Sequence, residues 1–249
     1  MDLIKIEECV DIVCYPKHRA NEKECRNRIN ELKSHGVKFI INFGRIKIDN
    51  IYVLGKGFSS VILLTSYGDL PAVIKVRRFD SRRHSLMDEC KILSKASLYG
   101  VAPYVYLCHK DFIVMEYIHG LHLIEYIRQE INKDTLRRVI LELISKAFIL
   151  DLIGIDHGEL SRPWKHVLIS HKGVFIIDFE SASVSRRPHN VPCLVNALIL
   201  NPKSPLYEIF SSLRQVERKN IIDLLSLYKK SINYKVFKQL FELLYQYLQ

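Results

Sequence analysis

The spacing of apolar and polar positions changes near residue 36. Residues 19–35 combine strong helix formers with an apolar stripe, and Gly36 follows them as a stop signal, so we expect a helix that precedes the first sheet. Residues 37–77 instead contain short β-branched runs, such as "VKFIINFG" and "SSVILL", separated by Gly, Asp and Pro. That pattern is typical of an antiparallel meander.

One helix interrupts the predicted strands. Apolar residues recur at helical spacing from Leu86 to Ala96, and Gly100 ends the segment. The runs "APYVYLCHK" and "DFIVMEYI" follow, and they predict a strand pair that turns at residues 109–111. We therefore expect the sheet to resume after the helix.

Beyond Gly120 the pattern is mainly helical. Helical spacing extends over residues 123–131 and 134–154, and helices are expected from Pro192 onward. Between them, "HVLIS" and "GVFIIDF" predict a hairpin that turns at Lys172 and Gly173. In the tail one apolar stripe, expected to pack in the core or, alternatively, to bind a partner, contains Val236, Phe237, Leu240, Phe241, Leu244 and Leu248.

These segments predict an α+β fold in three parts. Residues 1–45 form an N-terminal helical extension, residues 46–119 an antiparallel β-sheet lobe with one helix, and residues 120–249 a compact, mainly α-helical lobe. An apolar content of 48% is enough to bury a core. No apolar run reaches the roughly 18 residues that a membrane span needs, and the first residues lack a signal-peptide pattern, so we expect a soluble cytoplasmic protein without membrane contact.

The six cysteines contain no CxxC pair, which argues against a zinc site or a secreted disulfide framework. We expect buried free thiols. In the cytosol of a thermophile, Cys9, Cys14 and Cys25 are instead candidates for one bridged pair.

The charge balance favours polyanionic partners. Lys and Arg number 37 against 27 Asp and Glu, a formal net charge of +10. RNA, a ribonucleoprotein particle, an acidic protein and nucleotide phosphates all fit such a charge. The clusters "KVRRFDSRRH" and "SRRPH" are either solvated faces or phosphate contacts.

Several short motifs carry candidate chemistry in the first half of the chain. Gly55 and Gly57 lie between two strands, where backbone amides can approach phosphate oxygens. Lys75 lies in an apolar strand, and a buried ammonium needs an anionic partner. Glu89, on the following helix, is well placed to reach back to Lys75.

Two further motifs follow in the second half. The loop "GIDHGELSRPWKHVLI" contains a His-Gly-acid sequence at His157 and Glu159, and the strand "VFIIDF" ends in Asp178. A carboxylate at a strand end suits a hard cation, or it caps the turn that follows.

The order of these motifs resembles the signature set of the protein-kinase-like superfamily. They are the glycine loop, the strand lysine, the helix glutamate, the hinge strand "IVMEYI", the His-Gly-acid loop and the strand-terminal aspartate. The resemblance covers roughly residues 50–185. It looks closest to small archaeal RIO-type kinases and to the lone kinase of the tRNA threonylcarbamoylation machinery, through "EC" followed by "KIL", "GVAP" and "LIGIDHGEL". More narrowly, the chain looks like an archaeal family of predicted serine/threonine kinases.

The resemblance implies a bilobal kinase-like fold that uses ATP and Mg²⁺, and it assigns roles by position. The residues implied to contact the nucleotide are Gly55, Gly57, Ser60, Ile62, Lys75, Glu116 and Ile118. The residues implied to position or carry out the chemistry are Lys75, Glu89, His157 and Glu159, with Asp178 as the magnesium ligand.

The sequence departs from that family at the catalytic loop. Glu159 stands where aspartate is usual, which makes slower transfer plausible, since such sites tolerate little misplacement. Trp164 occupies the place of the magnesium-binding asparagine. Alternatively, with two inserted residues, His166 takes that place, although imidazole is a poor magnesium ligand. With a single metal ion on Asp178, Arg162 or Lys165 would supply the missing positive charge near the phosphates.

A second departure follows Asp178. Glu180 replaces the glycine of the usual Asp-Phe-Gly, and the chain has no Ala-Pro-Glu and almost no sequence for an activation loop. Regulated phosphorylation of peptides is therefore not expected.

Three functions fit these residues. The first is an ATP- and magnesium-dependent phosphotransferase, an atypical serine/threonine protein kinase or slow ATPase that acts on or with a macromolecule. The second is a nucleotide- or RNA-binding scaffold with impaired catalysis. The third is a small-molecule kinase of the aminoglycoside or choline type, for which the segment between Gly120 and His157 leaves little room.

Overall fold

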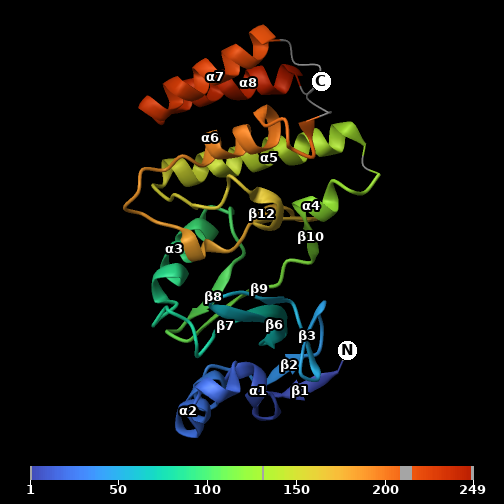
Figure 1. Ribbon diagram of the computed structural model, residues 1–249, viewed down its shortest axis with the longest axis vertical. Coiled ribbons are helices and arrows are strands. Elements are labelled where there is room, and N and C mark those ends of the chain that lie inside the picture. Colours follow the sequence, from blue (N-terminus) through green and yellow to red (C-terminus); the bar gives the residue numbers. More distant parts are fainter. Residues whose placement is uncertain (1, 131, 208–214, 248–249) are drawn as a thin grey trace. The chain divides into compact units, whose positions relative to one another are not determined.

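The computed structural model describes residues 2–130, 132–207 and 215–247 (Figure 1). It is a mixed α and β structure with an antiparallel sheet and a helical region. Two compact units divide the chain. The first contains Met1–Ser94 and Pro103–Tyr117, and the second contains Lys95–Ala102 and Ile118–Gln249.

The first unit is built on one antiparallel sheet of seven strands. In spatial order its strands are β1 (Leu3–Lys5), β2 (Phe39–Ile41), β6 (Ser60–Tyr67), β7 (Leu70–Arg77), β9 (Phe112–Glu116) and β8 (Val105–Cys108), and β5 (Gly55–Lys56) also pairs with β6. A separate hairpin joins β3 (Ile46–Ile48) to β4 (Ile51–Val53). The predicted antiparallel sheet and the β8–β9 pair are therefore confirmed, but the meander is interrupted, because β3 and β4 pair only with each other and β2 lies next to β6.

Helices α1 (Val10–Val13), α2 (Glu22–Ser34) and α3 (Met87–Leu98), with the short turns η1 (Ile6–Glu8) and η2 (Lys17–Arg19), complete this part of the chain. The Asn21 side chain caps α2 by accepting a hydrogen bond of 2.8 Å from the Glu24 amide. Gly36, at a φ of 88°, follows the end of α2 as expected. Apolar side chains of α1, α2 and the sheet form one core.

Residues 1–45 differ from the predicted helical extension. Strand β1 pairs with β2, which pairs with β6, so a strand comes before the helix and both strands belong to the main sheet. The buried Arg28 of α2 binds this region together: its guanidinium donates to Val13 O at 3.0 Å, to Arg77 O at 2.8 Å and to Asp111 Oδ1 at 3.1 Å. Burial lowers the pKa of Arg28 to about 10, so the group stays charged at neutral pH.

The expectation of free thiols was wrong for four cysteines. Disulfides join Cys14 to Cys25 and Cys90 to Cys108, with Cα–Cα distances of 5.7 and 5.8 Å. The partners are 11 and 18 residues apart in sequence, and only the packing of α1 on α2 and of α3 on β8 brings them within bonding range. Cys14–Cys25 is one of the bridges that the thermophile alternative allowed.

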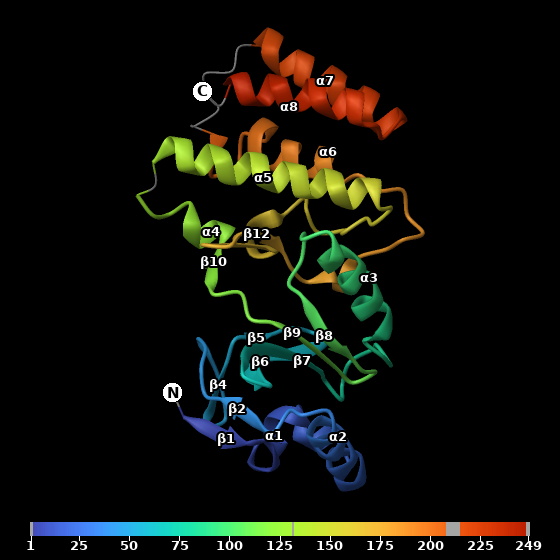
Figure 2. The same ribbon diagram turned by 180° about the vertical axis from the view of Figure 1, so that it is seen from behind.

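The second unit contains a small antiparallel sheet and most of the helices. Its strands are β10 (Gly120–His122), β11 (Val167–Ser170) and β12 (Gly173–Ile176). Its helices are α4 (Leu123–Tyr126), α5 (Lys133–Leu152), α6 (Asn190–Val195), the π-helical turn η5 (Asn196–Leu200), α7 (Gln215–Lys230) and α8 (Tyr234–Tyr247), with 3₁₀ turns η3 (Pro163–Lys165) and η4 (Phe179–Ser181). In both views α5 lies between the small sheet and the α7–α8 pair (Figures 1 and 2).

Most predicted elements of this half are confirmed, with three differences. The hairpin β11–β12 and the long helix α5 are present, but α4 ends at Tyr126, and β10 adds an unpredicted third strand. The helix expected from Pro192 onward is interrupted at residues 201–206 and 231–233. Residue 131, residues 208–214 and Leu248, all predicted helical, lie outside the described residues. In the tail, the predicted stripe is buried at Val236, Phe237, Leu240 and Leu244, and Phe237 stacks on Phe148 of α5 at 3.8 Å between ring centres.

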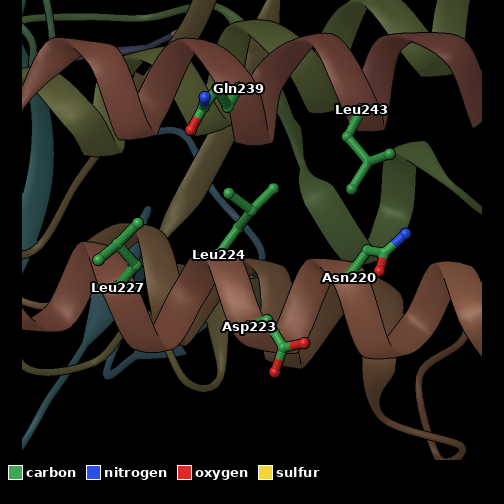
Figure 3. Close-up of a pocket in the computed structure, with 6 residues that line it drawn as sticks. All are labelled: Asn220, Asp223, Leu224, Leu227, Gln239 and Leu243. Carbon is green, nitrogen blue, oxygen red and sulfur yellow. The ribbon is translucent and has the colours of Figure 1, made fainter.

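A shallow pocket lies between α7 and α8 (Figure 3). It is lined by Asn220, Asp223, Leu224, Leu227, Gln239 and Leu243. None of these is a predicted site residue. Over the described residues, no helix combines the length and the apolar character that crossing a membrane requires.

Candidate functional site

The glycine loop of the first unit is a tight turn between β5 and β6. Gly55 pairs with Ile62, Ile62 pairs with Lys75, and Lys75 pairs with Ile113, so these residues form one row across four strands. A side chain at Gly55 would bring its Cβ to 3.3 Å from Ile62 Cδ1. Glycine at this position therefore avoids a tight contact with Ile62.

Gly57 and Ser60 close the tip of this loop. The Gly57 amide donates to Ser60 O at 2.9 Å, and Arg78 donates to Gly57 O at 2.7 Å. Ser60 is only 3% exposed, so it shapes the loop and does not present its hydroxyl at the surface. Phe58, by contrast, is 97% exposed at the tip, which is unusual for a large apolar side chain outside a binding surface.

Lys75 and Glu89 form a buried ion pair in the first unit, as expected from their positions. Lys75 Nζ lies 2.5 Å from Glu89 Oε1, and the two side chains are 4% and 2% exposed. The second glutamate oxygen lies 4.0 Å from Arg83 Nη1. This pair fixes a positive charge on the strand next to the glycine loop, while its role in binding stays a prediction.

The predicted hinge lies where the first unit ends and the second begins, between Tyr117 and Ile118. The Glu116 amide donates to Tyr104 O at 2.7 Å, and its side chain accepts from the Tyr104 amide at 3.4 Å. The Glu116 N–H is therefore already hydrogen-bonded within the first unit. Ile118 is 5% exposed.

In the second unit a buried carboxylate organises the His-Gly-acid loop. Asp151, at the end of α5, accepts hydrogen bonds from the Asn190 amide and side chain at 2.8 and 2.7 Å, from the Val191 amide at 3.1 Å and from Tyr228 OH at 2.8 Å. Asn190 in turn donates to Ile155 O at 2.6 Å and accepts from the His157 amide at 3.0 Å. Burial raises the pKa of the Asp151 carboxyl, although these hydrogen bonds oppose the shift.

His157 braces the loop as a neutral imidazole. It is completely buried, its Nε2 lies 3.0 Å from Ile177 O, and its Nδ1 accepts from the Glu159 amide at 3.4 Å. That arrangement requires the proton on Nε2. Burial lowers the pKa of His157 to about 4, so the ring orients its neighbours and does not act as a charged group at neutral pH.

Both carboxylate oxygens of Glu159 are engaged. Oε1 accepts from the Ser181 hydroxyl at 3.0 Å, and Oε2 lies 3.3 Å from Arg162 Nη2. The Glu159 side chain is 27% exposed and Arg162 is 79% exposed. These contacts restrain a side chain that is one methylene longer than aspartate.

Asp178 adopts a left-handed conformation, with φ 64° and ψ 72°. Such a backbone is costly for a residue other than glycine and persists where the surroundings impose it, often at functional sites. In the described part of the chain the Asp178 side chain does not cap the η4 turn, so the capping alternative is not realised. The side chain is 42% exposed.

The residues around Asp178 fit magnesium only in part. His166 Nδ1 lies 3.8 Å from Asp178 Oδ2, and imidazole nitrogen is not a ligand that magnesium prefers. Among the described residues, no group of three or more His, Cys, Asp or Glu could hold a metal by itself. Magnesium bound with a nucleotide usually takes only one or two carboxylates and completes its shell with phosphates and water, and a single exposed Asp178 meets that requirement.

Several basic side chains of the two clusters have internal roles. Arg77 pairs with Asp111 at 2.6 Å, and Arg186 Nε donates to the buried Asp156 at 2.7 Å. Arg187 donates to Lys230 O at 2.8 Å. Part of each cluster therefore supports the fold. Lys165, which belongs to neither cluster, is exposed in the η3 turn that follows the His-Gly-acid sequence.

Three residues near these positions were not predicted from the sequence. Asp151 and Ser181 belong to no motif in the sequence. Their hydrogen-bond partners, Tyr228 and Glu159, lie 77 and 22 residues away in the chain. Phe58 had a usable signal, because a large apolar residue directly after Gly57 in a loop is unusual.

A comparison with protein-family models gives no match. A protein of Methanocaldococcus jannaschii described as uncharacterized is 33% identical to this chain over 76 residues. The matched segment covers 30% of this chain and 64% of that protein.

Proposed function

We propose that this protein is an ATP- and magnesium-dependent phosphotransferase with a bilobal kinase-like fold, of the atypical serine/threonine kinase type, with slow turnover. The observation that carries the proposal is the buried Lys75–Glu89 pair beside the glycine loop. A buried ion pair is often no more stable than a well-packed apolar pair. Fixed positive charge at the phosphates of a nucleotide is a function that accounts for a pair of this kind.

The second unit supplies the other groups that phosphoryl transfer needs. Glu159 is the candidate base for an acceptor hydroxyl, and His157 holds its loop. Asp178 would hold the magnesium ion, which would neutralise charge on the phosphate oxygens.

The engaged state of Glu159 supports a low rate. A base must be free to accept the proton of the acceptor, and here Oε1 already accepts from Ser181 while Oε2 faces Arg162. Either contact must be exchanged before another hydroxyl can approach. The same contacts favour the second candidate function, a nucleotide-binding scaffold without turnover.

The net charge of +10 supports a polyanionic partner for either function, such as RNA or an acidic protein. Binding that depends on this charge weakens steeply with added salt.

Incubation of the purified protein with γ-labelled ATP and magnesium tests the proposal, with free phosphate and protein-bound label both followed. We expect the wild type to turn over ATP. Asp178→Asn and Glu159→Gln should still bind ATP but should not turn it over, and Glu89→Gln should bind ATP more weakly. Asp88→Asn is the matched control for Glu89, because it lies next to it on α3 with a side chain that is 96% exposed.

Magnesium-dependent ATP binding without turnover in any protein would favour the scaffold. Absence of ATP binding, or equal binding by the wild type and Glu89→Gln, would contradict both functions.

A further inference from the structure

The hydroxyl of Ser181 occupies the position that an acceptor hydroxyl needs. Its Oγ donates to Glu159 Oε1 at 3.0 Å. A general base must lie about 2.6–3.2 Å from the atom whose proton it takes. Ser181 is thus the chain's own serine within reach of the candidate base.

The backbone holds Ser181 in this place. It ends the η4 turn, three residues after Asp178, and its carbonyl accepts from Arg186 Nη2 at 2.6 Å. On the other side lies Gly158, where an added Cβ would come within 2.8 Å of Ser181 O and 3.3 Å of Ser181 Cβ. The glycine of the His-Gly-acid loop therefore leaves the room that Ser181 occupies.

We propose that Ser181 is an internal phosphoacceptor, which the protein phosphorylates on itself with bound ATP. The inference rests on the proposed function and names one acceptor for it. Ser181 Oγ forms a bond to the γ-phosphorus of ATP as the bond between that phosphorus and the β,γ-bridging oxygen breaks. The serine proton passes to Glu159 and then to water, and ADP leaves with the electron pair of the broken bond.

Two guanidinium groups flank the product. Arg186, whose side chain is 51% exposed, already contacts the Ser181 carbonyl, and the exposed Arg162 lies beside Glu159. A phosphoserine carries nearly two negative charges, which arginine pairs with strongly and a carboxylate repels. Phosphorylation therefore exchanges the Ser181–Glu159 hydrogen bond for contacts with arginine and separates the acceptor from the base.

The test uses the full-length protein, magnesium and γ-labelled ATP, with the modified residue located by mass spectrometry of peptides. We expect one added phosphoryl group on Ser181, and a labelling rate per molecule that does not change with protein concentration. Label should be lost in Ser181→Ala and in Glu159→Gln. Ser181→Thr should carry the label on the new hydroxyl, which shows that the site accepts phosphate and is not only needed for folding.

Ser185→Ala is the matched control. Its hydroxyl lies 2.9 Å from Ser183 Oγ in the same segment and does not contact Glu159, so this variant should be labelled like the wild type. Circular dichroism of each variant checks that the fold is kept.

The failures of the two proposals are distinguishable. Release of phosphate, or label on other residues, without phosphoserine at 181 would overturn the internal acceptor and leave the phosphotransferase intact. A rate that rises with protein concentration would indicate transfer between molecules and would also overturn it. Without any ATP turnover, both proposals fall.

Discussion

Acidification should destabilise this protein through His157. The imidazole is completely buried, its Nε2 proton is donated to Ile177 O, and burial lowers its pKa from 6.5 to about 4. In the unfolded chain the imidazole binds a proton near pH 6.5. Between the two pKa values the unfolded state holds one more proton than the folded state, so stability falls as the pH falls through this window.

The size of the effect follows from the two pKa values. Each pH unit between them is worth about 1.4 kcal/mol, so the full loss approaches about 3 kcal/mol between pH 6.5 and pH 4. That is a large part of the stability of an ordinary domain. The contribution is fully present above pH 6.5.

Urea unfolding of the wild type and of His157→Asn across this pH range measures the prediction. The raised pKa of Asp151 works in the opposite direction, but it is present in both proteins and largely cancels in the comparison. We expect the free energy of unfolding to fall more steeply with acid in the wild type. Equal slopes, or an NMR titration that gives His157 a pKa near 6.5 or a proton on Nδ1, would refute the reasoning.

Three further predictions concern stability. Gly158→Ala should lower the free energy of unfolding by about 1–3 kcal/mol more than Gly154→Ala, as measured by chemical unfolding. Both glycines have positive φ, 84° and 76°, but only at 158 would the added Cβ meet neighbouring atoms. Equal losses of stability would contradict that contact. Replacement of both Cys90 and Cys108 by serine should lower the free energy of unfolding by about 3 kcal/mol, as expected for the 18-residue separation that the bridge closes. If the double variant is as stable as the wild type, and the intact mass of the wild type shows free thiols, the bridge does not form. Glu89→Gln should lower the melting temperature in the absence of nucleotide, by an amount that corresponds to about 3 kcal/mol, because it removes the carboxylate charge that faces the buried Lys75 ammonium. An unchanged melting temperature would mean that this ion pair does not stabilise the fold.

The sequence determined those features that depend on one element or on two neighbouring elements. Apolar spacing predicted α2, α3 and α5, and alternation with turn residues predicted the β8–β9 and β11–β12 hairpins. The Lys75–Glu89 contact was also predictable, because a charge in an apolar strand needs a partner and the next helix offered one on its buried side.

Tertiary structure decided what depends on partners far apart in the chain. Strand β1 joined the sheet through β2, and the cysteines paired across packed elements. The Asp151 carboxylate accepts hydrogen bonds from residues of α6 and α7. Ser181 reached Glu159 across 22 residues. The periodicity of a segment shows which face is buried, but not which other segment covers it, so the contacts that shape this candidate site could be found only in the folded chain.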